Sequence, residues 1–314
     1  MSKKRFVSRS VFTILAASFL FAAACSDDSS PTSEGGTTLV QLNLSGLKPL
    51  EEGFNYQAWA IQYYYAYPLG IFNFNQAGQM VNVAGDSVLS GEFAVNLAPD
   101  EITDIAISIE AQDEMATTPA YTLILAGVVS EGQVDLTVED ELGIGVSFED
   151  AAGKYVLATP TDGSGTNENS GIWFLDLSTG VSLTGLNLPE LPSGWNYEGW
   201  VLVGDTYLST GRFDQFSAAD ESSDYSGSAA SPPFPGEDFL QNAPAGVSFP
   251  LDLAGVSVMI TVEPWEGYDD NEEAPFFLKI LTANIPPDAA DHVTYDMSPV
   301  SDPLPAGTAT LTQP

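Results

Sequence analysis

A seven-residue phrase occurs twice in this chain and restricts its fold more than any other feature. Residues 53–59 read GFNYQAW, and residues 194–200 read GWNYEGW. Further landmarks follow the two copies in the same order: Gly91–Phe93 with Gly211–Phe213, Ile107–Glu110 with Ile260–Glu263, and Ile124–Leu125 with Ile280–Leu281. Because a shared order of landmarks indicates an internal repeat, we predict two copies of one domain.

The spacing of the landmarks predicts an insertion in the first copy. There, 32 positions separate Trp59 from Gly91. In the second copy only 11 positions separate Trp200 from Gly211, which leaves room for a tight hairpin turning at residues 204–205. We therefore expect a tyrosine-rich insertion to replace this hairpin in the first copy.

The hydrophobic pattern predicts strands throughout the mature chain. Apolar and polar residues alternate over short runs such as residues 40–44 and 256–262, and Gly, Pro, Asn and Asp bound these runs. No stretch sustains a helical period with a cap at each end. We therefore predict an all-β protein with two tandem β-sandwich domains of the immunoglobulin-like kind.

The domain boundaries follow from changes in composition. We assign residues 38–138 to the first sandwich and residues 154–285 to the second, which contains an Asp/Ser/Pro/Gly-rich insertion at residues 214–250. Residues 286–314 are rich in Pro and Asp, and we expect this tail to lie over a surface or to fray.

Residues 1–24 are typical of a secretory signal peptide. Four basic residues come first, and the apolar run Val11–Ala24 that follows is too short to span a bilayer. Residues 25–37 are mostly Ser, Asp, Gly and Thr, so we expect them to form a flexible tether.

The signal ends in small residues followed by Cys25, the only cysteine in the chain. This arrangement resembles the lipobox of bacterial lipoproteins, although Ala22 stands where leucine is commonest. The resemblance implies that Cys25 carries the lipid, which anchors the protein to a membrane of the bacterial cell envelope, periplasmic or at the cell surface. The alternative is ordinary cleavage after an Ala-x-Ala site, which leaves an exported free thiol.

Beyond the signal the chain is strongly acidic. The signal holds four of the eight Lys and Arg residues and none of the 43 Asp and Glu residues. This charge excludes nucleic acid as a partner, and anionic headgroups would repel the protein body. A solvated, salt-tolerant surface explains the acid most simply, and calcium or a basic partner is the functional alternative.

The residue inventory does not favour an enzyme or a cofactor. His292 is the only histidine, and with Cys25 lipidated neither an ordinary zinc site nor a Cys-His pair can form. Asp162 and the acidic turn with Asp269 and Asp270 are weak calcium candidates, for which solvated turns are the simpler interpretation.

The tyrosine-rich segment is the most distinctive candidate for a binding surface. Its aromatic residues are Tyr63, Tyr64, Tyr65, Tyr67, Phe72 and Phe74. Clustered Tyr and Phe side chains at a sandwich edge suit stacking on sugars or on a protein partner. The alternative is that they cover an open end of the core.

The repeated phrase also predicts which of its rings are buried. Tyr and Trp lie three positions apart in each copy, and this offset places them on opposite faces of a regular strand. We expect the larger and more apolar Trp59 and Trp200 to face the core. For Tyr56 and Tyr197 we expect hydroxyl groups bonded to the backbone.

The stretch 188–201, LPELPSGWNYEGWV, resembles the start of the extracytoplasmic domain of anti-sigma-K factors, which has the pattern Leu-Pro-x-Leu-Pro-x-Gly-x-x-Tyr-x-x-Trp. Residues 211–213 and 262–264 match its later Gly-x-Phe strand and Val-Glu-Pro turn. The first copy departs from the pattern at residues 48–50, which read Lys-Pro-Leu. The family's sigma-binding region has no counterpart in this sequence, so the resemblance implies the outer module alone, without catalytic residues or a sigma-factor contact.

Together these features suggest a lipid-anchored, non-catalytic lipoprotein that binds or scaffolds a protein or glycan outside the cytoplasm. Two rivals remain. A hydrolase predicts a carboxylate pair facing one cleft, and a glycan-binding module predicts that the tyrosines line an exposed face.

Overall fold

Antiparallel strands make up nearly all of the regular structure. The computed structural model describes residues 36–111, 115–163, 165–264 and 274–314. These residues contain twenty strands and two short 3-10 turns, η1 (Pro99–Glu101) and η2 (Glu168–Ser170). Across the described ranges, no helix has the length and apolar character needed to span a membrane. The prediction of an all-β, sandwich-like protein is confirmed.

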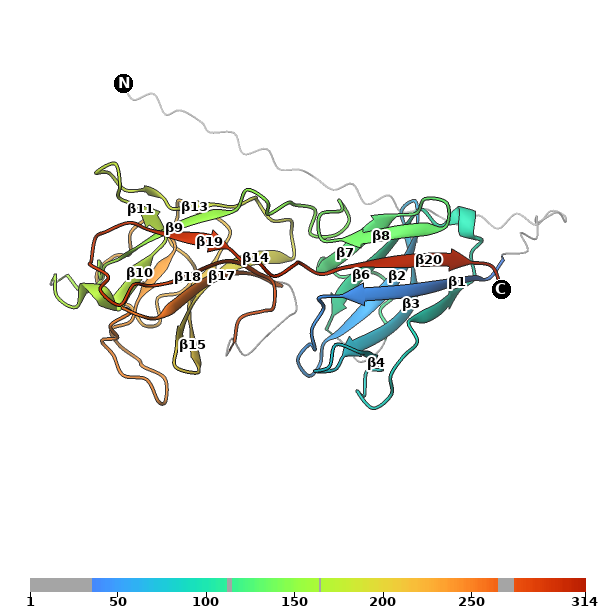
Figure 1. The fold of residues 1–314 in the computed structure, drawn as a ribbon, viewed down its shortest axis with the longest axis horizontal. Coiled ribbons are helices and arrows are strands. Elements are labelled where there is room, and N and C mark those ends of the chain that lie inside the picture. Colours follow the sequence, from blue (N-terminus) through green and yellow to red (C-terminus); the bar gives the residue numbers. More distant parts are fainter. Residues whose placement is uncertain (1–35, 112–114, 164, 265–273) are drawn as a thin grey trace, which may run out of the picture. The chain divides into compact units, whose positions relative to one another are not determined.

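The first sheet runs in the order β4-β3-β2-β6-β7-β8-β20-β1-β5 (Figure 1). In that order the strands are Met80–Val81, Tyr65–Phe74, Asn55–Gln62, Asp104–Glu110, Leu123–Val128, Gln133–Thr137, Ala306–Thr312, Thr38–Ser45 and Glu92–Val95. All neighbouring strands are antiparallel.

The second sheet runs in the order β15-β14-β17-β18-β19-β9-β10-β16, and β13 (Leu186–Asn187) also pairs with β9. The ordered strands are Thr206–Phe213, Trp195–Val203, Ser257–Pro264, Lys279–Asn284, Tyr295–Pro299, Ala152–Leu157, Gly171–Trp173 and Gly236–Asp238. A separate pair joins β11 (Leu175–Asp176) to β12 (Leu183–Thr184).

The two sheets share one strand order. Starting from β3 in the first sheet and β15 in the second, the strands along the two paths correspond position by position. The chain also visits these positions in the same sequence, with one exception. The position between β19 and β10 is filled by β9, which begins the second set, whereas the matching position between β8 and β1 is filled by β20 at the end of the chain.

The expectation for the tail at residues 286–314 is therefore wrong, because β19 and β20 are integral strands of the two sheets. In β20 only Ala309 and Leu311 are buried, which is too short an apolar alternation to recognise beside the prolines. The described residues all fall within one compact unit, and β20 lies outside the range assigned to the first sandwich. The division into two domains at the stated boundaries stays a prediction.

The repeated phrase opens two hairpins of identical register. Tyr56 pairs with Phe72 and Tyr197 pairs with Phe213, and each hairpin has a bulge just before its tryptophan. Gly70 and Gly211 each lie 11 positions after that tryptophan. The counterpart of residues 211–213 is thus residues 70–72 in β3, not residues 91–93 in β5. The tyrosine-rich segment is consequently no insertion: it is the β2–β3 hairpin itself.

Tyrosine and tryptophan lie on opposite faces of each strand, as their offset of three predicts. It is the tyrosine, however, and not the tryptophan, that faces the main core. Tyr56 and Tyr197 belong to the main hydrophobic core. Trp59 lies on the other face among Ala106, Ala116 and Ala126. Both tryptophans are fully buried, so burial was predicted correctly and the side was not.

The tyrosines occupy the core because their hydroxyl groups reach the backbone. Tyr56 Oη donates to the Lys48 carbonyl at 2.9 Å, and Tyr197 Oη donates to the Pro189 carbonyl at 2.8 Å. Each acceptor lies eight positions earlier in the chain. A satisfied hydroxyl removes the main cost of burying tyrosine, and the expected backbone bonds are confirmed.

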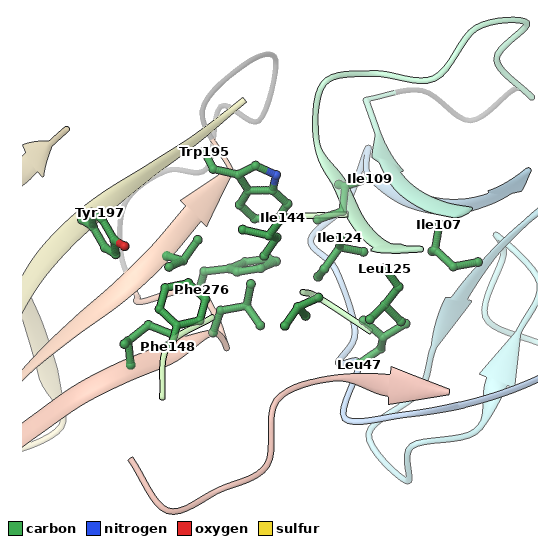
Figure 2. Close-up of a cluster of buried hydrophobic side chains, with 14 of the residues drawn as sticks. Leu47, Ile107, Ile109, Ile124, Leu125, Ile144, Phe148, Trp195, Tyr197 and Phe276 are labelled. Atoms are coloured by element: carbon green, nitrogen blue, oxygen red, sulfur yellow. The ribbon is translucent and has the colours of Figure 1, made fainter. Parts of the chain in front are cut away.

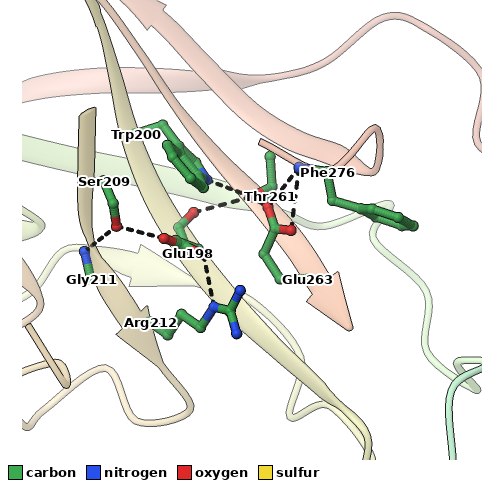
Figure 3. A network of polar contacts seen from close by, with 8 residues as sticks. All are labelled: Glu198, Trp200, Ser209, Gly211, Arg212, Thr261, Glu263 and Phe276. Carbon is green, nitrogen blue, oxygen red and sulfur yellow. Dashed lines mark hydrogen bonds and ion pairs between the residues drawn. The ribbon is translucent and has the colours of Figure 1, made fainter. Parts of the chain in front are cut away.

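On the opposite face, each tryptophan begins a short relay of buried hydrogen bonds. Trp59 Nε1 donates to Ser108 Oγ at 2.8 Å, which donates to Glu110 Oε1 at 2.5 Å. In the second sheet Trp200 Nε1 donates to Thr261 Oγ1 at 3.0 Å, and Thr261 donates to Glu263 (Figure 3). These residues belong to the predicted landmark pair 107–110 and 260–263.

Each buried glutamate also accepts a backbone amide from farther along the chain. Glu110 accepts the Ala120 amide at 3.0 Å, and Glu263 accepts the Phe276 amide at 3.0 Å. Phe276 itself enters the main core, where its ring lies 6.3 Å from that of Trp195 (Figure 2). The carboxylate therefore links one face of the sheet to packing on the other.

Glu263→Ala is expected to lower the free energy of unfolding by about 3 kcal/mol, because the Thr261 hydroxyl and the Phe276 amide each lose a buried acceptor. Glu263→Gln keeps an acceptor oxygen and should cost only about 1 kcal/mol. Urea unfolding monitored by tryptophan fluorescence measures both values. Equal losses for the two variants would contradict a hydrogen-bonding role.

Candidate functional site

The β2–β3 hairpin exposes three consecutive tyrosines, two in its turn and one at the start of β3, which we call the tyrosine tip. The side chains of Tyr63, Tyr64 and Tyr65 are 75%, 99% and 70% exposed. Large aromatic side chains in a row at such exposure are unusual on a soluble surface. The tip is therefore the strongest candidate for a binding surface among the described residues.

The second hairpin shows what this turn needs for folding alone. The turn between β14 and β15 has the same length and consists of Gly204 and Asp205, residues typical of tight hairpins. Gly204 adopts φ 63°, and Tyr63 in the matching position adopts φ 57°. A left-handed conformation costs a non-glycine residue roughly 1–2 kcal/mol. Tyrosine at this position opposes stability, so the turn geometry does not explain it.

The base of the tip is held by hydrogen bonds. The Tyr63 amide donates to Thr103 Oγ1 at 3.3 Å, and Thr103 Oγ1 donates to the Ile61 carbonyl at 3.1 Å. On the other side of the hairpin Tyr67 Oη donates to Gln62 Oε1 at 3.0 Å. These bonds fix the backbone below the turn while leaving the three rings in solvent.

The remaining aromatic residues predicted to bind a ligand are not part of this surface. Tyr67 is half-buried, whereas Phe72 and Phe74 are buried in the core. Their rings pack against Tyr56 at centroid distances of 5.7 and 5.6 Å. The expected ligand contact is wrong for Phe72 and Phe74, for which core covering was the correct alternative.

Several predicted features lie outside the described residues: the signal at residues 1–24, Cys25, the tether up to residue 35, and the calcium candidates Asp269 and Asp270. Asp162 is described and half-buried. Neither near it nor elsewhere in the described ranges do three or more His, Cys, Asp or Glu side chains form a group able to hold a metal.

Sequence reasoning missed a set of carboxylates that fasten the 214–250 segment. Asp238 in β16 is fully buried and accepts the Thr161 amide and Trp173 Nε1, each at 2.8 Å. Its neighbour Glu237 is also fully buried and accepts Ser226 Oγ. Acidic residues are rarely buried, so Glu237 and Asp238 were expected at the surface with the other acidic residues. No local sequence pattern marks them as different.

Asp220 completes this set from inside the same segment. Its carboxylate accepts the Gly236 amide at 2.7 Å and the Ser222 amide at 3.2 Å. Burial, with a smaller contribution from the nearby Glu237 and Glu198 charges, raises the pKa of Asp220 to about 8. Burial raises the pKa of Glu237 and of Asp238 as well. The hydrogen bonds of these three groups hold the segment against the sheet, with Glu237 and Asp238 fully buried and Asp220 half-buried.

The second sheet also contains a shallow hollow of about 510 Å³ beside β9. Lys154 Nζ and Asp176 Oδ2 meet there at 2.7 Å, next to Asn187 and Asp296. The bond to Lys154 holds the pKa of Asp176 well below its usual range. The two charged groups form an ion pair with each other and leave fewer polar groups for a ligand. The hollow is therefore a weaker candidate for a binding site than the tyrosine tip.

Comparisons with known proteins do not identify a family. No protein-family model and no curated protein matches the sequence. Among solved structures, the paired C2 domains of Extended-Synaptotagmin 2 are similar at 8% identity, covering 99% of this chain and 100% of that one, with a TM-score of 0.17. That score is too low to support an argument, and the resemblance to anti-sigma-K factors stays a prediction.

Asp220→Asn is expected to stabilise the protein increasingly as the pH rises. The raised pKa means that the stability contributed by the bound proton is present below about pH 4 and is lost as the pH rises through about 8. Asparagine stays neutral, so the difference from wild type should be largest above pH 8. Urea unfolding at pH 5, 7 and 9 measures it, and a parallel pH dependence of the two proteins would contradict the assignment.

Proposed function

We propose that this protein is an exported, lipid-anchored and non-catalytic binding lipoprotein that presents the tyrosine tip to a macromolecular partner outside the cytoplasm. The observation that carries the proposal is the contrast between the two equivalent turns. One has the Gly-Asp pair that a tight hairpin favours. The other has Tyr63, which adopts a strained positive φ, and Tyr64, and both side chains project into solvent.

The shape of the tip favours a large partner. Sites for small molecules are concave and surround most of the ligand, whereas Tyr64 is almost completely exposed. A projecting ring of this kind fits into a recess or lies on a surface of the partner. Tyrosine contributes a large contact area and a hydroxyl group at low cost in side-chain entropy. A protein partner and a glycan polymer both meet this description.

The acidic body limits the choice of partner. The 43 acidic side chains disfavour an anionic surface, so attachment to a membrane is assigned to the lipid on Cys25 rather than to the folded part. The outer-module resemblance to anti-sigma-K factors agrees with a binding role, without a sigma-factor contact. The hydrolase alternative has less support, because Glu237 and Asp238 are fully buried.

Exchanging the turn tests the tip with a control supplied by the chain itself. The double variant Tyr63→Gly with Tyr64→Asp copies the turn of the second hairpin into the first. Its free energy of unfolding should be about 1 kcal/mol higher, because glycine relieves the positive φ. Urea unfolding gives this value, and a loss of stability would show that the tyrosines serve the fold.

Binding is measured by placing a photo-crosslinking residue at position 64 in cells, with position 205 as the matched control. A protein or glycan adduct at 64, absent at 205, is expected. In a second experiment the crosslinking residue is placed at position 65. The adduct formed there should be lost when the same chain also carries Tyr63→Gly and Tyr64→Asp. Equal adducts at 64 and 205 would contradict a specific tip.

The lipid anchor is tested separately. Metabolic labelling with a fatty acid should mark the wild-type protein, and Cys25→Ser should remove the label and release the protein from the membrane fraction. Unlabelled wild-type protein that begins at another residue would instead support ordinary cleavage.

A further inference from the structure

The position between β8 and β1 in the first sheet, which we call the slot, is not filled by a strand from residues 38–137, which supply the other strands of that sheet. In the second sheet the matching position holds β9, which is joined to β10 by the 13 residues 158–170. In the first sheet it holds β20, whose Ala306 carbonyl accepts the Ser45 hydroxyl across a separation of 261 positions. The strand between β8 and β1 is therefore delivered from the far end of the chain.

The attachment of β20 rests largely on its backbone. It pairs along Leu39–Ser45 of β1 and Gln133–Thr137 of β8, and the Leu311 amide donates to the Gly132 carbonyl at 2.8 Å. Such a ladder closes around any chain that supplies the same strand, whether it comes from the same molecule or from another.

The slot is nevertheless selective for the sequence of β20. A Cβ atom on Gly307 would lie 2.6 Å from the Leu44 side chain, so only glycine fits there without a shift. Two and four positions later, Ala309 and Leu311 are buried at 0% and 6% exposure. The slot therefore takes a strand with the pattern Gly-x-Ala-x-Leu, which a second copy of this chain supplies in full.

The connection to β20 is suited to exchange. Six residues, 300–305, join it to β19, and they include Pro303 and Pro305. Residues 301–303 are exposed. Short connections that contain proline favour extended conformations and are typical hinges for swapping an element between identical chains.

From this geometry we propose that β20 is an exchangeable strand: the slot between β1 and β8 accepts β20 of a second copy, and the protein self-associates through this exchange. Because each molecule has one slot and one strand, reciprocal exchange gives a closed dimer, and one-way exchange gives a chain of molecules.

Single-cysteine variants distinguish exchange from closure within one molecule. Asn43 and Thr308 are directly paired and both exposed, at a separation that a disulfide can bridge. In a Cys25→Ser background, one full-length chain carries Asn43→Cys and the other carries Thr308→Cys. After mixing, incubation and mild oxidation, a disulfide-linked dimer of the two different chains is expected on a non-reducing gel. Mixing Asn43→Cys with Asp205→Cys measures random collision.

A second measurement uses the locked chain. With Asn43→Cys and Thr308→Cys in the same molecule, oxidation should hold β20 in its own slot, so the dimer seen for the reduced chain by size exclusion should be lost. The proposal is overturned if the mixed pair gives no more dimer than the collision control, or if the locked chain self-associates as well as the reduced chain does.

Discussion

A strand inside a sheet needs hydrogen-bonded neighbours on both sides. This requirement explains why β20 lies between β1 and β8 of the first sheet. The segment before β1 is polar, Ser-rich and without an apolar alternation. The backbone groups between β1 and β8 are hydrogen-bonded by β20 instead. Ala309 then stands in register between Leu42 and Val134, and all three are buried. This row and the buried pair of Val40 with Leu311 join β20 to the first core.

The two hairpins show how a repeat keeps its geometry while its local chemistry changes. Both keep the bulge, the core tyrosine and the tryptophan relay. The side chain after the tyrosine differs: Gln57 exchanges two hydrogen bonds with the backbone of Ala116, whereas Glu198 accepts Arg212 Nε at 3.0 Å. Equivalent positions thus hold a neutral side chain bonded to backbone in one sheet and a buried ion pair in the other. The pairing register of the hairpins is the same in both, which indicates that the backbone and the tryptophan relay set it.

Much of the fold could be predicted because the repeat lies in long, strongly alternating strands. The match of residues 107–110 to 260–263 identified β6 and β17 correctly. The tyrosine turn was hidden because neither Tyr63 nor Tyr64 is a usual turn residue, so a hairpin of normal length was interpreted as an insertion. The exposed tyrosines were predicted as candidates from the sequence. Only the pairing register of β2 with β3 shows that Phe72 and Phe74 lie in the core and not beside them. Burial of Glu237 and Asp238 depends on partners far away in the sequence, which local patterns do not contain.

The placement of β20 has a consequence for how the molecule is made. A chain that emerges amino end first presents β1 and β8 long before their shared neighbour exists. During that interval β1 and β8 each lack a neighbour on one side, and closure of the first sheet must wait for residues 306–312, which follow the last strand of the second sheet. Non-local pairing of this kind slows folding. Residues 38–137 are thus synthesised before the second sheet, but their own sheet closes only after it, which lengthens their exposure to chaperones and proteases.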